Sequence, residues 1–383
     1  MKLLIGADLV PTKSNEAFFE TADVNNLVSS DLLSIMNDVD YRIFNLETPL
    51  GDETAPINKC GSNFIASTST IAGIKRLGAN FFTLANNHIM DQGTQGLKST
   101  MDILDLHGIA YAGVGRSAME AAEPHIIEIN DKKVGIYCCA EHEFSIVTEH
   151  EAGANPFDPL ESFDHVQELR KKVNYIIVLY HGGKEYYRYP SPELQRVCRK
   201  FVDKGADIVV CQHSHCIGCE EKWNKGTIVY GQGNFLFDDD DNEFYQTSLL
   251  IQIDTEDNSI SYIPIQKDGA KVRLATDHKQ VILTEFYKRS NEIKMDGFIH
   301  HEYLNFADRM IIGYLLSLHG NLQRKLLYRV LNRLSKGALG RNIIKKSYKT
   351  YEFTRIFNYL SCESHRELIL YGVQNQLERR QQE

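Results

Sequence analysis

The chain of 383 residues is long enough for one domain of about 250 residues and a smaller second one. Hydrophobic residues make up 43% and charged residues 24% of it, which is typical of a soluble globular protein, and eight cysteines are too few for a disulfide scaffold. No apolar run approaches the ~20 residues of a spanning helix, and the N-terminal segment lacks a signal-peptide core. We therefore expect no transmembrane segment and a cytoplasmic protein.

The formal net charge of −9 is unevenly distributed along the chain. From Lys271 onward 20 Lys and Arg stand against 11 Asp and Glu, a net +9 that leaves −18 for residues 1–270. Acidic residues gathered around a site can hold cations. The basic C-terminal part could contact a membrane, nucleic acid or an acidic polymer, but we interpret it as a solvated helical surface and expect no nucleic-acid partner.

Short apolar runs alternate with helical patterns along the first 240 residues. The runs predict strands at residues 2–7, 41–46, 80–85, 109–112, 133–140, 175–180, 208–210 and 227–230. Amphipathic spacing and helix-stop glycines predict helices at residues 15–38, 67–79, 94–107, 167–173 and 191–204. This alternation predicts an α/β protein in which helices cover the faces of a sheet. A hairpin at 247–254 and 259–266 adds an antiparallel portion, and 141–163 is a long polar loop.

Beyond residue 280 no strand pattern persists, and apolar faces at 315–318, 326–334 and 356–360 predict helices. We therefore expect a first domain at 1–270 and a mainly helical, basic domain at 271–383. The Asp238–Asp241 run is interpreted as a solvated loop. Cys216 and Cys219 form a CxxC without a second pair at zinc-site spacing, so we expect free thiols there, with a structural zinc or redox pair as the alternative.

The most informative stretch is ADIVVCQHSHC at residues 206–216. A β-branched run, Ile208–Val210, stops at Gln212, and His213 and His215 follow where the strand gives way to a loop. In an extended chain, residues two apart point to the same side, so this pair could bind a metal. The competing interpretation is an ordinary pair of exposed or hydrogen-bonded histidines.

Four other strands also end in potential ligands. The complete set is Asp8, Asn45, Glu47, Asn86, Asn87, His88, Asp91, His181, His213 and His215. Ligands of open α/β sheets bind beyond the carboxyl ends of the strands, so these side chains are expected to converge. Mixed nitrogen and oxygen donors suit manganese, zinc or iron better than calcium, and a bridging carboxylate would allow two ions. Taken singly, each residue also has a structural interpretation, as a helix cap, a turn residue or a loop residue.

The series GADLV, FNLETPL, LANNHIMDQG, HGGKEY, GADIVVCQHSHC and GTIVYGQGNFLFD resembles the CapA family of bacterial capsule or poly-γ-glutamate biosynthesis proteins. That family is related to the calcineurin-like metallophosphoesterases. The resemblance covers roughly residues 1–265, with the motifs in the family's order, whereas residues 270–383 match no family pattern. It implies a metallophosphoesterase-like αββα sandwich with a C-terminal helical extension and a centre for two divalent metal ions.

The resemblance also assigns roles to individual residues. The implied ligands are Asp8 and His215 for the first metal, Asn87, His181 and His213 for the second, and Glu47 as the bridge. His88 would protonate the leaving group, oriented by Asp91. The remaining matched positions, expected to line the substrate pocket, are Asn45, Asn86, Glu185 and Asn234.

One departure from the family pattern affects the first metal. The phosphoesterase pattern has a histidine two residues after the first aspartate, where this chain has Val10, so the first site is one ligand poorer. We therefore keep two hypotheses. The first is a dinuclear hydrolase that cuts a phosphate ester or an amide or isopeptide bond of a capsule or surface polymer. The second is a non-catalytic assembly or polymer-binding component whose metal site is structural or vestigial.

Overall fold

The computed structural model describes residues 1–129, 132–237, 242–318 and 326–361, together with six isolated positions, His365, Ile369, Val373, Leu377, Arg379 and Arg380. It divides into two compact units, residues 1–300 and 301–383. The Asp238–Asp241 run, for which a solvated loop is expected, lies outside the described residues.

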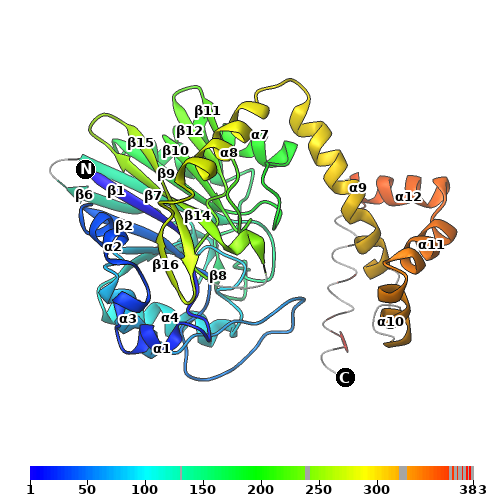
Figure 1. The fold of residues 1–383 in the computed structure, drawn as a ribbon, viewed down its shortest axis with the longest axis horizontal. Helices are drawn as coiled ribbons and strands as arrows, with labels where there is room; N and C mark the ends of the chain where they lie inside the picture. Colours follow the sequence, from blue (N-terminus) through cyan, green and yellow to red (C-terminus); the bar gives the residue numbers. More distant parts are fainter. Residues whose placement is uncertain are drawn as a thin grey trace. The chain divides into compact units, whose positions relative to one another are not determined.

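The first unit contains two mixed β-sheets (Figure 1). The strands of the first sheet are, in spatial order, β16 (Lys271–Leu274), β15 (Ser259–Asp268), β14 (Thr247–Asp254), β1 (Lys2–Leu9), β2 (Tyr41–Leu46), β3 (Phe81–Thr83) and β4 (Ala110–Ala112). A further strand, β13 (Asn234–Leu236), pairs with the end of β1. From β1 to β4 the strands are parallel, so their carboxyl ends lie at one edge of the sheet.

The strands of the second sheet are β11 (Glu220–Trp223), β12 (Gly226–Tyr230), β10 (Ile208–Gln212), β9 (Tyr175–His181), β7 (Lys132–Ala140) and β6 (His125–Ile129). Its central strands β12, β10, β9 and β7 are parallel. A small separate ribbon pairs β5 (Val114–Gly115) with β8 (Gly153–Ala154). The ribbon brings two residues of the predicted polar loop 141–163 into a regular strand.

Three buried clusters lie between four layers of secondary structure. On β1, Leu4 belongs to the cluster under the helices of the first sheet, whereas Ile5 belongs to the cluster between the sheets. On β9, Ile177 belongs to the same cluster between the sheets. Val178 lies in the third cluster, on the outer side of the second sheet, with Phe201 of a covering helix. Each such fully buried aliphatic side chain contributes about 1.5–3 kcal/mol. The predicted αββα sandwich is therefore confirmed.

The covering helices are short. Those of the first unit are α1 (Glu16–Glu20), α2 (Ser30–Asn37), α3 (Ile71–Arg76), α4 (Gly93–Leu106), α5 (Ala118–Ala121), α6 (Ser162–Arg170), α7 (Pro192–Asp203) and α8 (Lys279–Glu292), with 3-10 turns at Val24–Asn26, Thr68–Thr70 and Glu243–Tyr245. The prediction of one helix over 15–38 is wrong. Ala22 adopts a positive φ of 54° after α1, and Ser29 is extended before α2, so the segment breaks into two helices and a 3-10 turn.

The unit boundary lies later than the expected boundary at residue 270. β16 pairs with β15 in the first sheet, and the following helix α8 contacts β11 and β15. Phe286 of α8 is fully buried in the cluster between the sheets. Residues 271–300 therefore complete the first unit. The second unit is helical, with α9 (Phe298–Leu318) leading into α10 (Leu326–Leu334), α11 (Ala338–Ser347) and α12 (Thr350–Ser361).

Two sequence predictions concern properties of the whole chain. Among the helices in the described ranges, none combines the length and apolar character needed to cross a bilayer. The seven cysteines that the structure describes are free thiols, including Cys216 and Cys219, which are both buried.

Candidate metal centre

Side chains from both sheets converge at the carboxyl ends of four parallel strands. Asp8 lies near the end of β1 and Glu47 directly after β2, while His181 is the last residue of β9. The loop after β10 contributes His213 and His215. These five side chains form overlapping groups whose ligand atoms lie within 4.8 Å of one another. All five residues are at most 6% exposed, so the cluster is inside the protein.

Two of the three ligand groups share Glu47. One contains Glu47 with His181 and His213, and another contains Glu47 with Asp8 and His215. The closest ion-pair distances fit this arrangement, with 3.6 Å from His181 Nε2 to Glu47 Oε1 and 4.0 Å from His215 Nε2 to the same oxygen. A carboxylate between two histidine-containing groups is positioned to bridge two cations.

The third group changes the interpretation of Glu185, which the sequence suggested as a pocket residue. Glu185 lies with His213 and His215 in a group of the same ligand spacing. It is only partly buried, unlike the other candidate ligands. Glu185 is therefore a further candidate carboxylate ligand beside His213 and His215, at the less buried side of the cluster.

Three atoms at the centre of the cluster have unfulfilled hydrogen-bonding capacity. Among the described residues no partner accepts from or donates to Asp8 Oδ2, Glu47 Oε1 or His213 Nδ1, although all three atoms are buried. Leaving such groups unpaired costs about 1–3 kcal/mol each, more for charged ones. Each of the three residues belongs to a ligand group, and divalent cations held by these groups would satisfy the three atoms. The residues present therefore fit a metal site.

The electrostatics of His181 and His213 agree with this fit. Burial, followed by the charge of His213, holds the pKa of His181 well below its usual range, and burial with the nearby His215 lowers the pKa of His213 to about 3. Both imidazoles are therefore neutral at pH 7, the form that binds metals. Burial and the adjacent Asp8 carboxylate raise the pKa of Glu47 well above its usual range. Burial lowers the pKa of His215, but Asp8, Asn234 and Glu185 together act in the other direction and the pKa is raised.

The two histidines after β10 meet for a different reason from the one expected. The strand ends at Gln212, and His213 and His215 both adopt positive φ, 86° and 53°. The alternation of an extended strand therefore does not apply to them. Their ring centroids are nevertheless 6.0 Å apart, and His213 lies 4.8 Å from the ring of His181. Left-handed backbone at two non-glycine residues is a strained arrangement of the kind found at functional sites.

Three asparagines predicted around the site support the ligands. Asn45 is fully buried and donates to Asp8 Oδ1 at 2.8 Å, and Asn86, also fully buried, donates to Asn45 Oδ1 at 3.0 Å. Asn234 Oδ1 lies 2.9 Å from His215 Nδ1. Hydrogen bonds of this kind orient metal-ligating side chains. Asn45 and Asn86 have no exposed surface, so they act from the buried side of the cluster. Asn45 orients Asp8, and Asn86 orients Asn45.

Asn87, which the resemblance suggests as a metal ligand, lies beside His181. Its Oδ1 is 3.0 Å from His181 Nε2, and its Nδ2 donates to Glu143 Oε2 at 2.9 Å. The amide oxygen therefore faces the histidine of the proposed second site, while the amide nitrogen is directed to the loop that carries Glu143. Sequence reasoning did not identify Glu143, because an acidic residue in a polar loop has no distinguishing pattern.

His88 and Asp91 form the pair predicted from the sequence, with two additional contacts. His88 Nδ1 lies 2.6 Å from Asp91 Oδ2, and the Lys59 ammonium donates to Asp91 Oδ1. Lys59 Nζ is also 3.2 Å from His88 Nδ1, and the Lys59 side chain is only 2% exposed. Phe64 stacks on the His88 ring with centroids 4.1 Å apart. Lys59 and Phe64 lie in a polar, irregular stretch in which no sequence signal indicated a contact with the site.

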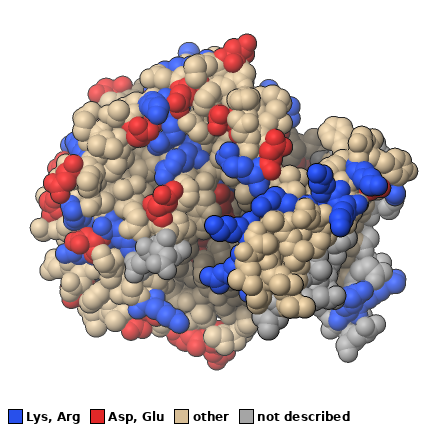
Figure 2. All heavy atoms as spheres, turned by 45° about the vertical axis from the view of Figure 1, so that its right-hand side comes forward, with Lys and Arg blue, Asp and Glu red and all other residues tan. Residues whose placement is uncertain are grey.

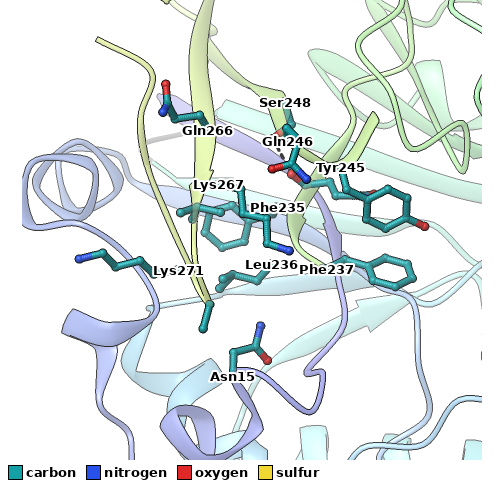
Figure 3. Close-up of a pocket in the computed structure, with 13 residues that line it drawn as sticks. Asn15, Phe235, Leu236, Phe237, Tyr245, Gln246, Ser248, Gln266, Lys267 and Lys271 are labelled. Atoms are coloured by element: carbon teal, nitrogen blue, oxygen red, sulfur yellow. Dashed lines mark hydrogen bonds between the residues drawn. The ribbon is translucent and has the colours of Figure 1, made fainter. Parts of the chain in front are cut away.

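Aromatic side chains border the cluster on the His215 side. The rings of Phe237 and Tyr245 each lie 5.3 Å from His215, and Tyr186 lies 6.1 Å away. Figure 3 shows Phe237 and Tyr245 beside a small cavity that lies between the ends of β13 and β15. Its volume of about 10 Å³ has room for no more than about one water molecule. This cavity therefore does not take a substrate.

The two-layered sheet core, its covering helices and the buried histidine–carboxylate cluster together define a four-layered α/β sandwich with a candidate metal centre at the ends of its strands. Residues 3–239 match the family of bacterial capsule synthesis proteins designated PGA_cap, and the chain belongs to that family.

The curated relatives agree with this family. The capsule biosynthesis protein CapA of Bacillus anthracis is 27% identical over 235 residues, which cover 59% of this chain and 57% of that protein. The PGA biosynthesis protein CapA of Bacillus subtilis (strain 168) is 30% identical over 172 residues, 43% of this chain and 44% of that one. The chain thus spans about half the length of these relatives. Among solved structures, a phosphatase of Mycoplasma pneumoniae is similar at 13% identity with a TM-score of 0.44, over 70% of this chain and 94% of that one.

Proposed function

We propose that this protein is a divalent-metal-dependent hydrolase that acts in the biosynthesis of a capsule or cell-surface polymer. The observation that carries the proposal is the arrangement around Glu47. Two ligand groups share this carboxylate, and the three unsatisfied atoms of Asp8, Glu47 and His213 lie in these groups. The polymer context is taken from the curated relatives, which are named for capsule and PGA biosynthesis.

Two ions would be held by ligands from both sheets. Asp8 and His215, with Glu185 at the open side, would bind the first, and the second would be bound by Asn87, His181 and His213, with Glu47 between them. The mixture of imidazole, carboxylate and amide donors favours manganese, zinc or iron. When bound, such ions lower the pKa of water toward neutrality and stabilise negative charge that develops on the substrate.

The contribution of the chain's own residues centres on His88. Its Nδ1 is engaged by Asp91, which leaves Nε2 as the atom that can give a proton to a leaving group. Lys59 binds the other Asp91 oxygen, and Phe64 packs on the ring, so the imidazole is held from two sides. A His88 side chain that is 13% exposed remains accessible to substrate. This arrangement suits hydrolysis of a phosphate ester, and equally of an amide or isopeptide bond.

The proposal is tested by elemental analysis together with hydrolysis assays. The wild-type protein, purified without chelator and supplied with manganese or zinc, is compared with His213→Ala and His88→Ala on aryl phosphomonoesters, aryl phosphodiesters and a γ-glutamyl isopeptide. His300→Ala, at an exposed histidine outside the cluster, is the matched control. We expect His213→Ala to lose bound metal and activity, and His88→Ala to keep its metal but lose about 10²–10⁴-fold in turnover. Turnover that survives in His88→Ala would refute the assigned role.

One observation favours a second function, that of a non-catalytic polymer-binding component. Val10, at the position where the resemblance leads one to expect a histidine ligand, is an apolar side chain only 4% exposed. A first site without that ligand would hold its ion more weakly. This alternative is supported if the wild-type protein binds soluble poly-γ-glutamate tightly, carries at most one ion per chain and cleaves none of the three substrates.

A further inference from the structure

The second unit is built around a small core on one side of its helices. Tyr328 of α10, Leu316 of α9 and Ile344 of α11 are each at most 7% exposed and belong to one cluster. Asn332 Oδ1 of α10 accepts a hydrogen bond from Gly340 N at 2.8 Å. Tyr328 and Asn332 are one helical turn apart, so this face of α10 is directed to the core.

The other face of α10 is apolar and exposed. Leu327, Val330, Leu331 and Leu334 are 72%, 47%, 45% and 76% exposed. Their spacing of i, i+3, i+4 and i+7 places all four on one stripe of the helix, which in a globular protein normally packs against a core. We call these four residues the α10 strip. Among the described residues of this unit no layer covers the stripe, and an exposed apolar stripe of this length indicates an interaction surface.

The helices of the second unit are rich in exposed basic residues. In the described ranges 301–318 and 326–361, nine Lys and Arg stand against three Asp and Glu. The exposed members on α10, α11, α12 and their connections are Arg329, Arg333, Lys336, Arg341, Lys345, Lys346, Lys349 and Arg355. Figure 2 shows blue Lys and Arg atoms gathered on these helices beside uncharged surface. The second unit thus combines an exposed aliphatic strip with a positive net charge.

Charge and apolarity together favour one kind of partner. A second copy of this unit would place two basic surfaces against each other, and the repulsion would oppose that contact. A soluble acidic polymer would satisfy the charges but leave the strip in water. An anionic lipid surface takes the aliphatic side chains at the boundary of headgroups and acyl chains and attracts the lysines and arginines. We propose that the α10 strip, assisted by the basic residues of these helices, binds the surface of an anionic bilayer.

Binding of this type lies in the plane of the membrane and requires no spanning helix. The proposal is independent of the metal centre, because every residue it uses belongs to the second unit. Each basic side chain near an anionic surface contributes about 1 kcal/mol, or roughly fivefold in affinity. The contribution is screened by salt.

The test is sedimentation of the full-length protein with vesicles of phosphatidylcholine alone and with vesicles containing equal parts of phosphatidylglycerol. The strip variant is Leu327→Ser with Leu331→Ser, and the charge variant is Lys345→Gln with Lys346→Gln. The matched control is Leu160→Ser, a leucine of the first unit that is 80% exposed. Because all the substituted side chains are exposed, we expect each variant to fold, which circular dichroism verifies.

We expect the wild type and Leu160→Ser to bind only the anionic vesicles, and the binding to weaken at high salt. The strip variant should lose about tenfold or more in affinity. The charge variant should lose on the order of tenfold. Binding that is unchanged in the strip variant, or the absence of any binding to anionic vesicles, would overturn the proposal. So would wild-type dimers, detected by analytical ultracentrifugation, that dissociate in the strip variant, because the strip would then be an interface between copies.

Discussion

Replacing Glu47 by glutamine should have opposite effects on the metal-free and the metal-loaded protein. Glu47 is fully buried, and its pKa is raised well above 4.5 by burial and by the Asp8 carboxylate. The folded protein therefore holds this proton more tightly than the unfolded chain does. The resulting stability is fully present below the ordinary carboxyl pKa and is lost as the pH rises through the raised value. Glutamine has the same shape and stays neutral at every pH.

In the metal-free protein, Glu47→Gln should consequently raise the melting temperature at pH 8 and have little effect at pH 4. The metal-loaded protein should respond in the other direction, because the variant lacks the bridging carboxylate. A ligand present at one hundred times its dissociation constant stabilises the folded state by about 2.7 kcal/mol. For the first unit this corresponds to a shift of about 5 °C in melting temperature. We expect the wild type to show that shift and Glu47→Gln to lose most of it.

The assay is thermal unfolding followed by dye fluorescence, between pH 4 and pH 8, with chelator or with manganese or zinc. Asp38→Asn, at an exposed carboxylate outside the cluster, controls for a general effect of removing charge. A Glu47→Gln protein that is less stable than the wild type without metal at pH 8, and that keeps the full metal-dependent shift, would refute the reasoning. It would mean that Glu47 is stabilised by its protein surroundings and takes no part in binding an ion.

Further predictions concern the packing around two glycines and the segment that carries Lys59. Gly218→Ala should destabilise the protein by about 1–3 kcal/mol, because an added Cβ would lie 1.7 Å from the carbonyl oxygen of Tyr230. Gly313→Ala, in a helix with open space around it, should stabilise by up to about 1 kcal/mol, and chemical denaturation measures both. Lys59→Met should make the segment around residue 59 more sensitive to limited proteolysis than in the wild type, because the substitution breaks the buried pair with Asp91. Lys59→Arg keeps the positive charge and should leave the segment protected. Equal cleavage of the wild type and Lys59→Met would contradict that role.

Much of the candidate site could be predicted from local sequence. Asp8, Glu47 and His181 each follow an apolar run that is too short for a helix and too apolar for a loop. Such a run predicts a buried parallel strand, and side chains after parallel strands meet at one edge. The helix predicted at 191–204 could also be predicted from local sequence, because Ser191 caps it through its side chain and Pro192 lies in the first turn.

Other features depended on contacts between distant segments. The predicted helix over 15–38 failed because its periodic apolar residues persist through a break at Ala22, and a hydrophobic pattern does not record backbone angles. Likewise, the positive φ of His213 and His215 arises in the loop that follows β10. Neither feature is visible in residue types alone.

The sequence by itself determined which short apolar runs form the strands of the first unit and which ligand chemistry follows them, because hydrophobic periodicity and donor atoms are local properties. Only the tertiary structure decided that the strands form two sheets, that Glu47 is shared by two ligand groups, and that Lys59 lies against Asp91. It alone also revealed that the α10 strip is exposed. These facts join residues far apart in the chain, and the free energy that selects such contacts comes from the packing of the whole core rather than from any one segment.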